Sequence, residues 1–384
     1  MSQISSSDFK LGIMSGGQLG KMLTQAASVF DVQTYVMDPS LEAPSASICH
    51  QFFQGDQTNF DDVYNFGKKV NLLTFEIEHI NIEALRKLKQ EGVTVYPDPE
   101  TLNTIKDKGL QKEFYKKHNI PTSAFQIYKS KEEVLKALDS GEITYPFVQK
   151  LRTDGYDGKG VAVVLNASKL DRLMDAPCIV EDAVNIEKEL AVIVARSPSG
   201  EIKCFPLVEM EFNEEANLVE QLICPADISK EVEAKSIEIA IEVAKAFDLV
   251  GLLAVELFLD KSGEISVNEA APRTHNSGHH TIEANVTSQY EQQLRAIFDW
   301  PLGDTTILSP AVMLNLLGEA GFTGTVKYEG LEEVMKVPGV KPHIYGKKLT
   351  KPFRKMGHVT ILGETIEIAK EKAEIVKNTL KVKA

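Results

Sequence analysis

Residues 145–165 read YPFVQKLRTDGYDGKGVAVVL, and this stretch decides the fold. Short runs rich in β-branched and aromatic residues flank the glycine-rich segment 153–160, which predicts a strand, a loop and a second strand. A P-loop would instead follow a GxxxxGK[ST] pattern and open a helix. The glycines let the backbone approach phosphate oxygens, and Lys150 and Lys159 add positive charge. We therefore favour a mobile lid over phosphates rather than an ordinary hairpin turn.

The segment LLAVELFLDKSGEISVNEA (252–270) reads as two strands joined by a tight turn at Lys261-Ser262. A two-residue turn would place Glu256 and Glu269 on one face of the hairpin as diagonal neighbours, with Cβ atoms roughly 7–8 Å apart. Glu256 interrupts an apolar strand, where an unpaired charge is costly. The alternative is an internal salt bridge to Lys or Arg. Since Mg²⁺ prefers a few carboxylates together with nucleotide phosphates, we favour a metal site.

The first 100 residues show an alternation of strands and helices that predicts a parallel α/β sheet. The expected strands are 9–14, 32–37, 70–75 and 93–96, and the expected helices are 18–29 and 82–90. A Lys-rich helix is expected over 101–118 and another over 230–247. We divide the chain into a Rossmann-like domain (1–100), a connector helix (101–121), a lid (122–182), a main subdomain (183–300) and a β-rich C-terminal extension (301–384).

The loop SGGQLG (15–20) follows the first strand and opens the first helix. It matches the dinucleotide fingerprint except that Ser15 replaces the first glycine, and Asp38 lies near the spacing of a ribose-binding acid. A helix N-terminus can hold any phosphate, so another phosphate ester is favoured over NAD. The alternative is that these small residues only let the strand and the helix pack closely.

Two polar segments lie in the last third of the chain. In PRTHNSGHHT (272–281), Arg273, His275, Asn276 and Ser277 suit an oxyanion, although the segment could also be a polar loop that caps a helix. Zinc binding by its histidines is disfavoured because no third ligand is fixed. In HIYGKKLTKPFRKMGH (343–358), the basic run is either a solvated face or a substrate-phosphate site in which Arg354 binds bidentately.

The composition is that of a soluble globular protein. Of 384 residues, 43% are hydrophobic and 25% are charged, and the formal net charge is −13. An acidic chain of this kind is a poor partner for nucleic acid or an anionic membrane. The four cysteines form no CxxC pair, and the N-terminus has no apolar signal segment. We therefore expect a cytoplasmic protein that binds small molecules.

Together these motifs resemble the ATP-grasp superfamily, and within it the N5-carboxyaminoimidazole ribonucleotide synthetases. The resemblance runs from about Leu11 to His358. The segments that carry it are GQLG (17–20), TFEIEHI (74–80), YPDPE (96–100), GYDGKG (155–160), NEAAPRTHNSGHHT (268–281) and YGK…RKMGH (345–358). The chain departs from the family pattern at Ser15, where a glycine is usual, and at Phe212, in a stretch where a histidine is frequent.

The resemblance implies an ATP-grasp fold with a Rossmann-like N-terminal domain, a small mobile lid and a larger β-rich domain. The implied metal ligands for Mg²⁺ or Mn²⁺ are Glu256 and Glu269. The implied catalytic residues are Tyr156, Asp157, Arg273, His275, Asn276 and Lys347. The implied ATP-binding residues are Lys108, Lys150, Gly155, Tyr156, Asp157, Gly158, Lys159, Gly160, Val161, Glu181, Asp182, Ala183, Val184, Glu189, Asn268 and Glu269. The implied ribonucleotide-binding residues are Gln18, Leu19, Glu76, Tyr156, Asp157, Lys347 and Arg354.

The implied activity is carboxylation of 5-aminoimidazole ribonucleotide with ATP and bicarbonate through carboxyphosphate, in purine biosynthesis. A homodimer, and a hand-off of the product to the mutase of the same pathway, are family expectations. Three alternatives stay open: an ATP-grasp ligase similar to biotin carboxylase or to glycinamide ribonucleotide transformylase, an NAD-dependent dehydrogenase, and a non-catalytic nucleotide-binding regulator.

Overall fold

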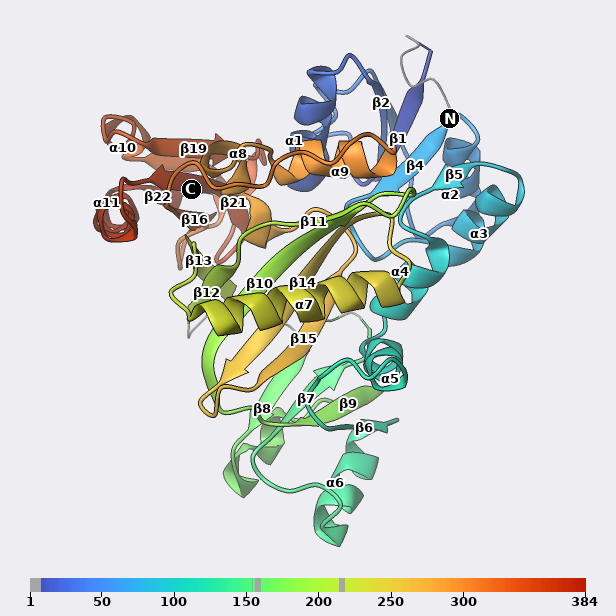
Figure 1. Ribbon diagram of the computed structural model, residues 1–384, viewed down its shortest axis with the longest axis vertical. Coiled ribbons are helices and arrows are strands. Elements are labelled where there is room, and N and C mark those ends of the chain that lie inside the picture. The colour runs from blue at the N-terminus through green and yellow to red at the C-terminus, as the bar shows by residue number, and fades with distance from the viewer. Residues whose placement is uncertain (1–7, 154, 156–159, 214–217) are drawn as a thin grey trace.

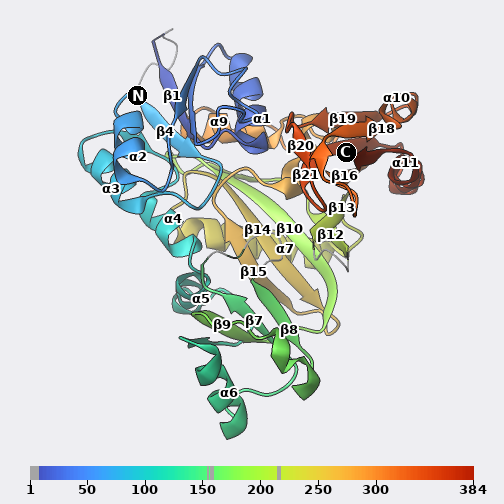
Figure 2. The ribbon, with the colours of Figure 1, turned by 180° about the vertical axis from the view of Figure 1, so that it is seen from behind.

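A computed structural model describes residues 8–153, 155, 160–213 and 218–384 (Figure 1). Within these ranges the chain forms three sheets of four or more strands, flanked by helices. Seen from behind in Figure 2, the N-terminal sheet and the C-terminal extension lie at one end of the molecule, and the lid lies at the other. None of the helices in the described ranges is long and apolar enough to cross a membrane.

The N-terminal sheet is parallel, as the sequence predicts, in the order β3-β2-β1-β4-β5. Its strands are β1 (Lys10–Met14), β2 (Gln33–Asp38), β3 (Gln51–Gln54), β4 (Leu72–Phe75) and β5 (Thr94–Val95), and its helices are α1 (Gln18–Ser28), α2 (Phe60–Gly67) and α3 (Ile82–Gln90). The sequence analysis did not predict β3 or α2. The strand β3 lies at the sheet edge and is partly exposed, so it lacks the continuous apolar run that reveals a buried parallel strand.

The connector consists of two helices, so the prediction of one helix over 101–118 is wrong. They are α4 (Pro99–Ile105) and α5 (Lys108–Lys117). The break falls at Asp107, whose backbone is extended and whose side chain accepts hydrogen bonds from Gly109 N (2.8 Å) and Leu110 N (3.2 Å). An N-cap that satisfies two backbone donors of α5 is incompatible with an uninterrupted helix.

The lid is an antiparallel sheet in the order β6-β9-β7-β8. It comprises β6 (Phe125–Tyr128), β7 (Phe147–Leu151), β8 (Val161–Val164) and β9 (Cys178–Asp182), with α6 (Lys131–Ser140) and the 3₁₀ helix η1 (Ala167–Arg172). Strand β7 pairs with β8, so the two strands predicted on either side of the glycine-rich segment are confirmed.

The largest sheet has nine strands, three of which come from the C-terminal extension; the other strands of the extension form two separate two-stranded sheets. Its strands are β10 (Ile186–Arg196), β11 (Ile202–Cys204), β12 (Val208–Asn213), β13 (Leu218–Cys224), β14 (Gly251–Asp260), β15 (Ile265–Ala271), β16 (Ala311–Leu317), β19 (Val340–Ile344) and β21 (Lys355–Leu362). Helix α7 (Lys230–Ala246), predicted from the sequence, packs on one face, and α9 (Gln289–Ile297) packs on the other. The shorter elements are η2 (Asn276–Gly278), α8 (Thr281–Ala284), β17 (Gly324–Thr325), β18 (Lys327–Glu329), α10 (Leu331–Val334), β20 (Leu349–Thr350), α11 (Ile366–Thr379) and β22 (Lys381–Lys383).

The turn between β14 and β15 is longer than predicted. The N–H of Asp260 donates to the carbonyl of Glu264 at 3.0 Å, so Lys261, Ser262 and Gly263 form the turn. The Asp260 carboxylate stabilises the longer turn, because it accepts hydrogen bonds from Ser262 N (2.8 Å) and Glu264 N (3.0 Å). Gly263 has a φ of +89°, a conformation that glycine adopts without strain.

This longer turn makes the predicted diagonal register wrong. Leu257 pairs with Val267, and after a bulge Glu256 pairs with Glu269. Asn268 is the extra residue on β15. A bulge shifts the register by one residue, and the two carboxylates therefore end directly opposite each other.

Four histidines are gathered where the C-terminal extension meets the loop after β15. The rings of His279 and His358 stack with centroids 4.5 Å apart, and those of His358 and His343 with centroids 4.4 Å apart. His280 directly follows His279 in the sequence and is 2% exposed. Burial lowers the pKa of His279 and His358 well below the usual value, and it lowers that of His280 to about 4.

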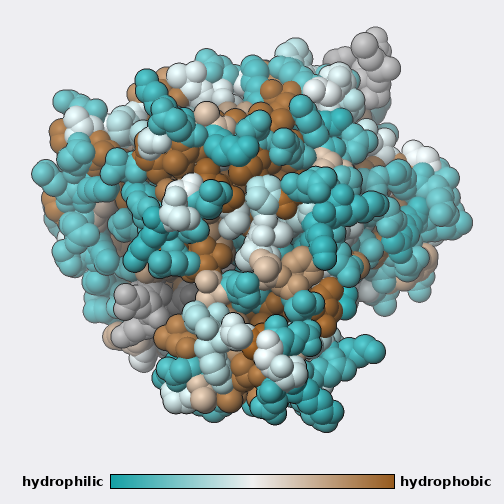
Figure 3. Space-filling view, turned by 60° about the horizontal axis from the view of Figure 1, so that its bottom comes forward, coloured by the Kyte–Doolittle hydropathy of each residue, from teal (hydrophilic) through white to brown (hydrophobic). Residues whose placement is uncertain are grey.

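The surface is mostly hydrophilic in the view of Figure 3, with hydrophobic residues in smaller areas between polar ones. His279, His280 and His358, by contrast, are at most 2% exposed and belong to the interior, where a positive charge is costly. Their neutral form is favoured by folding.

We predict that the histidine cluster makes folding sensitive to acid. The pKa of His280 is about 4 in the folded chain and 6.5 when unperturbed, so the unfolded chain takes up the proton first and stability is lost as the pH falls below 6.5. Replacing His280 by Leu should reduce the stability loss between pH 7.5 and 5.5 by about 1 kcal/mol. Chemical denaturation at both pH values measures this. The control is His118→Leu, at an exposed site, and an equal loss in wild type and His280→Leu would contradict the prediction.

Candidate functional site

One cleft of about 520 Å³ lies where the three sheets meet, and about half of the described candidate residues line it. The cleft is lined by residues of the N-terminal domain, the connector, the first part of the lid loop and the large sheet. The residues that line it include Gln18, Leu19, Glu76, Glu78, Lys108, Gly155, Phe212, Glu256, Glu269, Arg273, His275, Asn276, His279 and Lys355.

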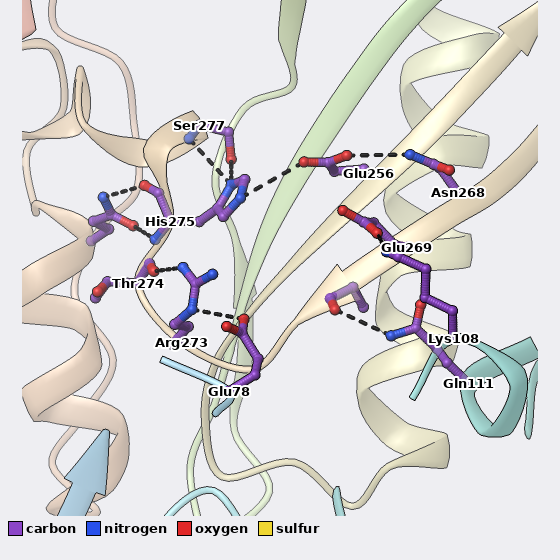
Figure 4. A network of polar contacts seen from close by, with 12 residues as sticks. Glu78, Lys108, Gln111, Glu256, Asn268, Glu269, Arg273, Thr274, His275 and Ser277 are labelled. Atoms are coloured by element: carbon purple, nitrogen blue, oxygen red, sulfur yellow. Dashed lines mark hydrogen bonds and ion pairs between the residues drawn. The ribbon is translucent and has the colours of Figure 1, made fainter. Parts of the chain in front are cut away.

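At one end of the cleft, Glu256 and Glu269 lie opposite each other on β14 and β15 (Figure 4). The Lys108 ammonium, in the first turn of α5, forms an ion pair with Glu269. The amide of Asn268 donates to Glu256 Oε2 at 3.3 Å. Lys108 lowers the pKa of Glu269, whereas burial, followed by the charge of Glu269, raises the pKa of Glu256. The internal salt bridge considered as an alternative is thus present, on Glu269.

Two more lysines extend this network into the lid. Lys150 Nζ, on β7, lies 2.7 Å from Glu181 Oε2 and 2.7 Å from Asn268 Oδ1. Lys112 Nζ, one turn after Lys108 on α5, lies 2.6 Å from Glu181 Oε1. Burial alone would raise the pKa of Glu181, but the two lysines hold it below its usual value. No role for Lys112 was predicted from the sequence, although its i, i+4 spacing from Lys108 places both lysines on one face of the helix.

Residues 181–184, which the resemblance implies as ATP-binding residues, connect the lid to the large sheet. Glu181 and Asp182 end β9, and Ala183 and Val184 follow as half-buried residues before β10. The Glu181 side chain is 3% exposed and faces the lysines, so it also contributes charge to the cleft network. Glu189 lies further along β10, and burial raises its pKa to about 7.

At the other end of the cleft, the loop after β15 places its polar residues together. Arg273 Nε forms an ion pair of 2.8 Å with Glu78 Oε1, and its Nη1 donates to the carbonyl of Thr274 (Figure 4). Glu78 was not predicted from the sequence. His275 Nε2 lies 3.7 Å from Glu256 Oε1, so it connects the two ends of the cleft.

The loop SGGQLG is stabilised by acids of the protein itself. The N–H of Gly20, at the start of α1, donates to the carboxyl group of Glu76, which is 3% exposed and whose pKa burial raises to about 8. A carboxyl group therefore already occupies the helix N-terminus that the sequence suggested for a phosphate. Asp38 accepts hydrogen bonds from Gly16 N (2.8 Å) and Ser15 Oγ (3.3 Å). Asp38 therefore stabilises the loop itself. This removes the argument, made from the sequence, that Asp38 binds the ribose of NAD.

Two predicted residues of the basic run do not line the cleft. Lys347 Nζ donates to the carbonyl of Lys355 at 2.8 Å, and Arg354 Nη1 donates to that of Leu349 at 2.6 Å. Lys355, the first residue of β21, lines the cleft instead. Several lysines lie close together in this run, so positive charge alone did not show which of them faces the cleft.

The lid loop is only partly described. Tyr156, Asp157, Gly158 and Lys159 lie outside the described residues. Gly155 lines the cleft, Gly160 has a φ of +77°, and Val161 begins β8. Phe212, where the family often has histidine, also lines the cleft.

Three family models match successive parts of the chain. The ribonucleotide synthetase preATP-grasp domain matches residues 9–106, the ATP-grasp domain 113–290, and the phosphoribosylaminoimidazole carboxylase C-terminal domain 311–372. The chain is 37% identical to the chloroplastic phosphoribosylaminoimidazole carboxylase of Vigna aconitifolia over 93% of its own length. It spans 63–65% of the length of that protein and of three yeast carboxylases that it matches.

Solved structures match over nearly the full chain. The N5-carboxyaminoimidazole ribonucleotide synthetase of Thermotoga maritima is 42% identical, with 98% of this chain and 99% of that chain covered and a TM-score of 0.90. The Aspergillus clavatus synthase, solved with ADP and 5-aminoimidazole ribonucleotide, is 30% identical, with 97% and 99% covered and a TM-score of 0.87. The cleft, the ATP-grasp fold and these matches agree, and the chain belongs to the N5-carboxyaminoimidazole ribonucleotide synthetase family of the ATP-grasp superfamily.

Proposed function

We propose that this chain uses ATP and bicarbonate to carboxylate 5-aminoimidazole ribonucleotide on its exocyclic amine, with release of ADP and phosphate. The observation that supports this best is a single cleft that joins a lysine–carboxylate end to an end with Arg273 and His275. A reaction that passes a reactive intermediate from ATP to a second substrate needs both ends in one enclosed space. The Aspergillus relative, solved with ADP and the ribonucleotide together, supports the same pair of ligands.

In the proposed reaction, an oxygen of bicarbonate attacks the γ-phosphorus of ATP, the bond between this phosphorus and the ADP oxygen breaks, and carboxyphosphate and ADP form. Lys108 and Lys150 would leave their carboxylate partners and neutralise the charge on the transferred phosphoryl group. Arg273, His275 and Asn276 would hold the bicarbonate and the carboxyphosphate at the other end. The amine of the ribonucleotide then attacks the carboxyl carbon, phosphate leaves, and the amine nitrogen gives up one proton to the departing phosphate.

The residues fit a magnesium ion that arrives with nucleotide. Glu256 and Glu269 supply hard oxygen ligands on facing strands, with Asn268 beside them. Within the described ranges, no group of three or more His, Cys, Asp or Glu residues is placed to hold a metal alone. Nucleotide phosphates would complete the ligand set, and Mn²⁺ would fit similarly. When bound, the metal supplies positive charge beside the phosphates.

For the ribonucleotide, we propose Gln18, Leu19 and Glu76 from the N-terminal domain, with Lys347 and Arg354 from the basic run. These two side chains would leave the backbone carbonyls that they contact outside the cleft and turn toward the bound ribonucleotide. Tyr156 and Asp157 of the lid loop belong to the same proposal. A homodimer, a hand-off to the mutase of the pathway and a cytoplasmic location are also part of it.

The decisive experiment measures ADP release while ATP, bicarbonate and 5-aminoimidazole ribonucleotide are omitted in turn. The proposed activity requires all three. Release that depends instead on biotin, or on glycinamide ribonucleotide with formate, would identify a different ATP-grasp ligase. Binding of ATP with no ADP release under any condition would favour a non-catalytic regulator.

We predict that Glu269→Gln abolishes turnover while the protein stays folded. A neutral amide is a weak ligand for a hard cation and a weak partner for Lys108. The matched control is Glu264→Gln, at an exposed position directly after the turn of the same hairpin, which should keep wild-type activity. Near-normal turnover of Glu269→Gln at ordinary magnesium would falsify this assignment.

We predict that Arg354→Lys raises the KM for the ribonucleotide and leaves that for ATP nearly unchanged. A planar guanidinium binds a phosphate monoester through two parallel bonds, which an ammonium cannot reproduce. The lost contact costs roughly 1.5–3 kcal/mol, or about ten- to a hundredfold in KM. Lys351→Arg, at an exposed neighbour, serves as the control. If both KM values rose together, or neither changed, Arg354 would not serve the ribonucleotide.

A further inference from the structure

Helix α9 carries three buried glutamines, and each holds a different segment of the chain. Gln289, Gln292 and Gln293 are at most 1% exposed. The amide of Gln292 accepts from Gly303 N at 2.8 Å and donates to its carbonyl at 3.2 Å. Gln293 accepts from Leu252 N at 2.8 Å, at the start of β14. The helix therefore anchors neighbouring backbone through side-chain amides rather than through apolar contacts alone.

Gln289 makes the same two-point contact with a residue of the cleft. Its Oε1 accepts the N–H of His275 at 2.9 Å, and its Nε2 donates to the carbonyl of His275 at 2.8 Å. The same Nε2 lies 3.2 Å from His279 Nδ1, which also lies 3.0 Å from the hydroxyl of Tyr290. The backbone N–H of Gln289 donates to Thr281 Oγ1 at 2.8 Å. Gln289 is thus fixed at its own backbone and fixes both backbone polar groups of His275.

The ring of His275 is oriented from its other side by Ser277. The backbone N–H of Ser277 donates to His275 Nδ1 at 3.3 Å, and Ser277 Oγ lies 2.9 Å from the same nitrogen (Figure 4). A backbone N–H can only donate, so Nδ1 acts as an acceptor and the ring proton is on Nε2. That proton faces Glu256 Oε1, 3.7 Å from Nε2. The orientation of the ring depends on where the backbone of His275 is held.

We propose that Gln289 is the positioning residue of His275, which it holds with Nε2 directed into the cleft between Glu256 and the oxyanion end. This rests on the proposed function, in which His275 contacts bicarbonate or carboxyphosphate. Gln289 itself does not line the cleft. Its effect on catalysis passes through His275, and a displacement of about 1 Å at a reacting site costs up to a hundredfold in rate.

Helix α9 provides the matched control for this proposal. Gln292 lies on the same helix, is equally buried and holds a backbone in the same two-point manner, but its partner Gly303 is not part of the cleft lining. Gln289→Met and Gln292→Met each remove one buried amide and keep the side-chain length. We expect similar losses of thermal stability from both variants.

Only Gln289→Met should change catalysis. We expect a ten- to hundredfold lower kcat and a higher KM for bicarbonate, with the KM for ATP within a factor of about two, because His275 serves the oxyanion and not the nucleotide. Gln292→Met should keep wild-type values. If Gln289→Met does not fold, Gln289→Glu replaces it, since this variant keeps the acceptor for His275 N–H and loses the donor.

A double-mutant cycle separates positioning from general damage. In a His275→Ala background, replacement of Gln289 should lower stability as before but leave the residual kcat unchanged. Additive losses of kcat, or equal losses in the Gln289 and Gln292 variants, would overturn the proposal. Failure of the proposed function gives a different result, namely a wild-type protein whose ADP release does not depend on bicarbonate and the ribonucleotide.

Discussion

The direct pairing of Glu256 with Glu269 is the constraint on which the rest of the site depends. Two carboxylates opposite each other on adjacent strands repel, and burial increases the cost. Lys108 offsets this cost without ligands, and its position at the start of α5 follows from the break at Asp107. Lys150 and Lys112, with Glu181 between them, connect the same charges to the lid. The connector, the lid and the large sheet therefore meet at one electrostatic network.

In this arrangement lysines and carboxylates are paired with each other at the place where a nucleotide would bring both phosphates and a cation. The lysines are paired with carboxylates, so negative phosphates and a positive metal can replace each partner in turn without leaving a buried charge unpaired. The opposite end of the cleft uses a different device. There the backbone of His275 is fixed by the neutral side-chain amide of Gln289, which holds the geometry without changing the charge balance. The site thus combines one end whose ion pairs can exchange partners with another end where uncharged hydrogen bonds hold the backbone of His275 in place.

The sequence predicted the parallel N-terminal sheet, helix α7, the strand–loop–strand lid and the pair of acids, because each has a local signal of period, turn or charge. It failed where a single polar residue overrides the pattern. Asp107 divides the connector helix, and the Asp260 carboxylate lengthens a turn and so changes the register of Glu256. Lys112, Glu78 and Gln289 escaped notice because their partners are distant in sequence. A buried glutamine on an amphipathic helix is indistinguishable from a surface one until its partner is known.

The proposed chemistry predicts the fate of one oxygen atom. An oxygen of bicarbonate becomes the bridge of carboxyphosphate, and when the amine attacks the carboxyl carbon that oxygen leaves with the phosphate. The most direct measurement uses ¹⁸O-labelled bicarbonate with ATP and 5-aminoimidazole ribonucleotide, followed by mass analysis of the released phosphate. The account predicts one ¹⁸O atom in the phosphate for each ADP formed. Unlabelled phosphate at full turnover would mean that ATP is hydrolysed by water in this cleft, and it would contradict the account.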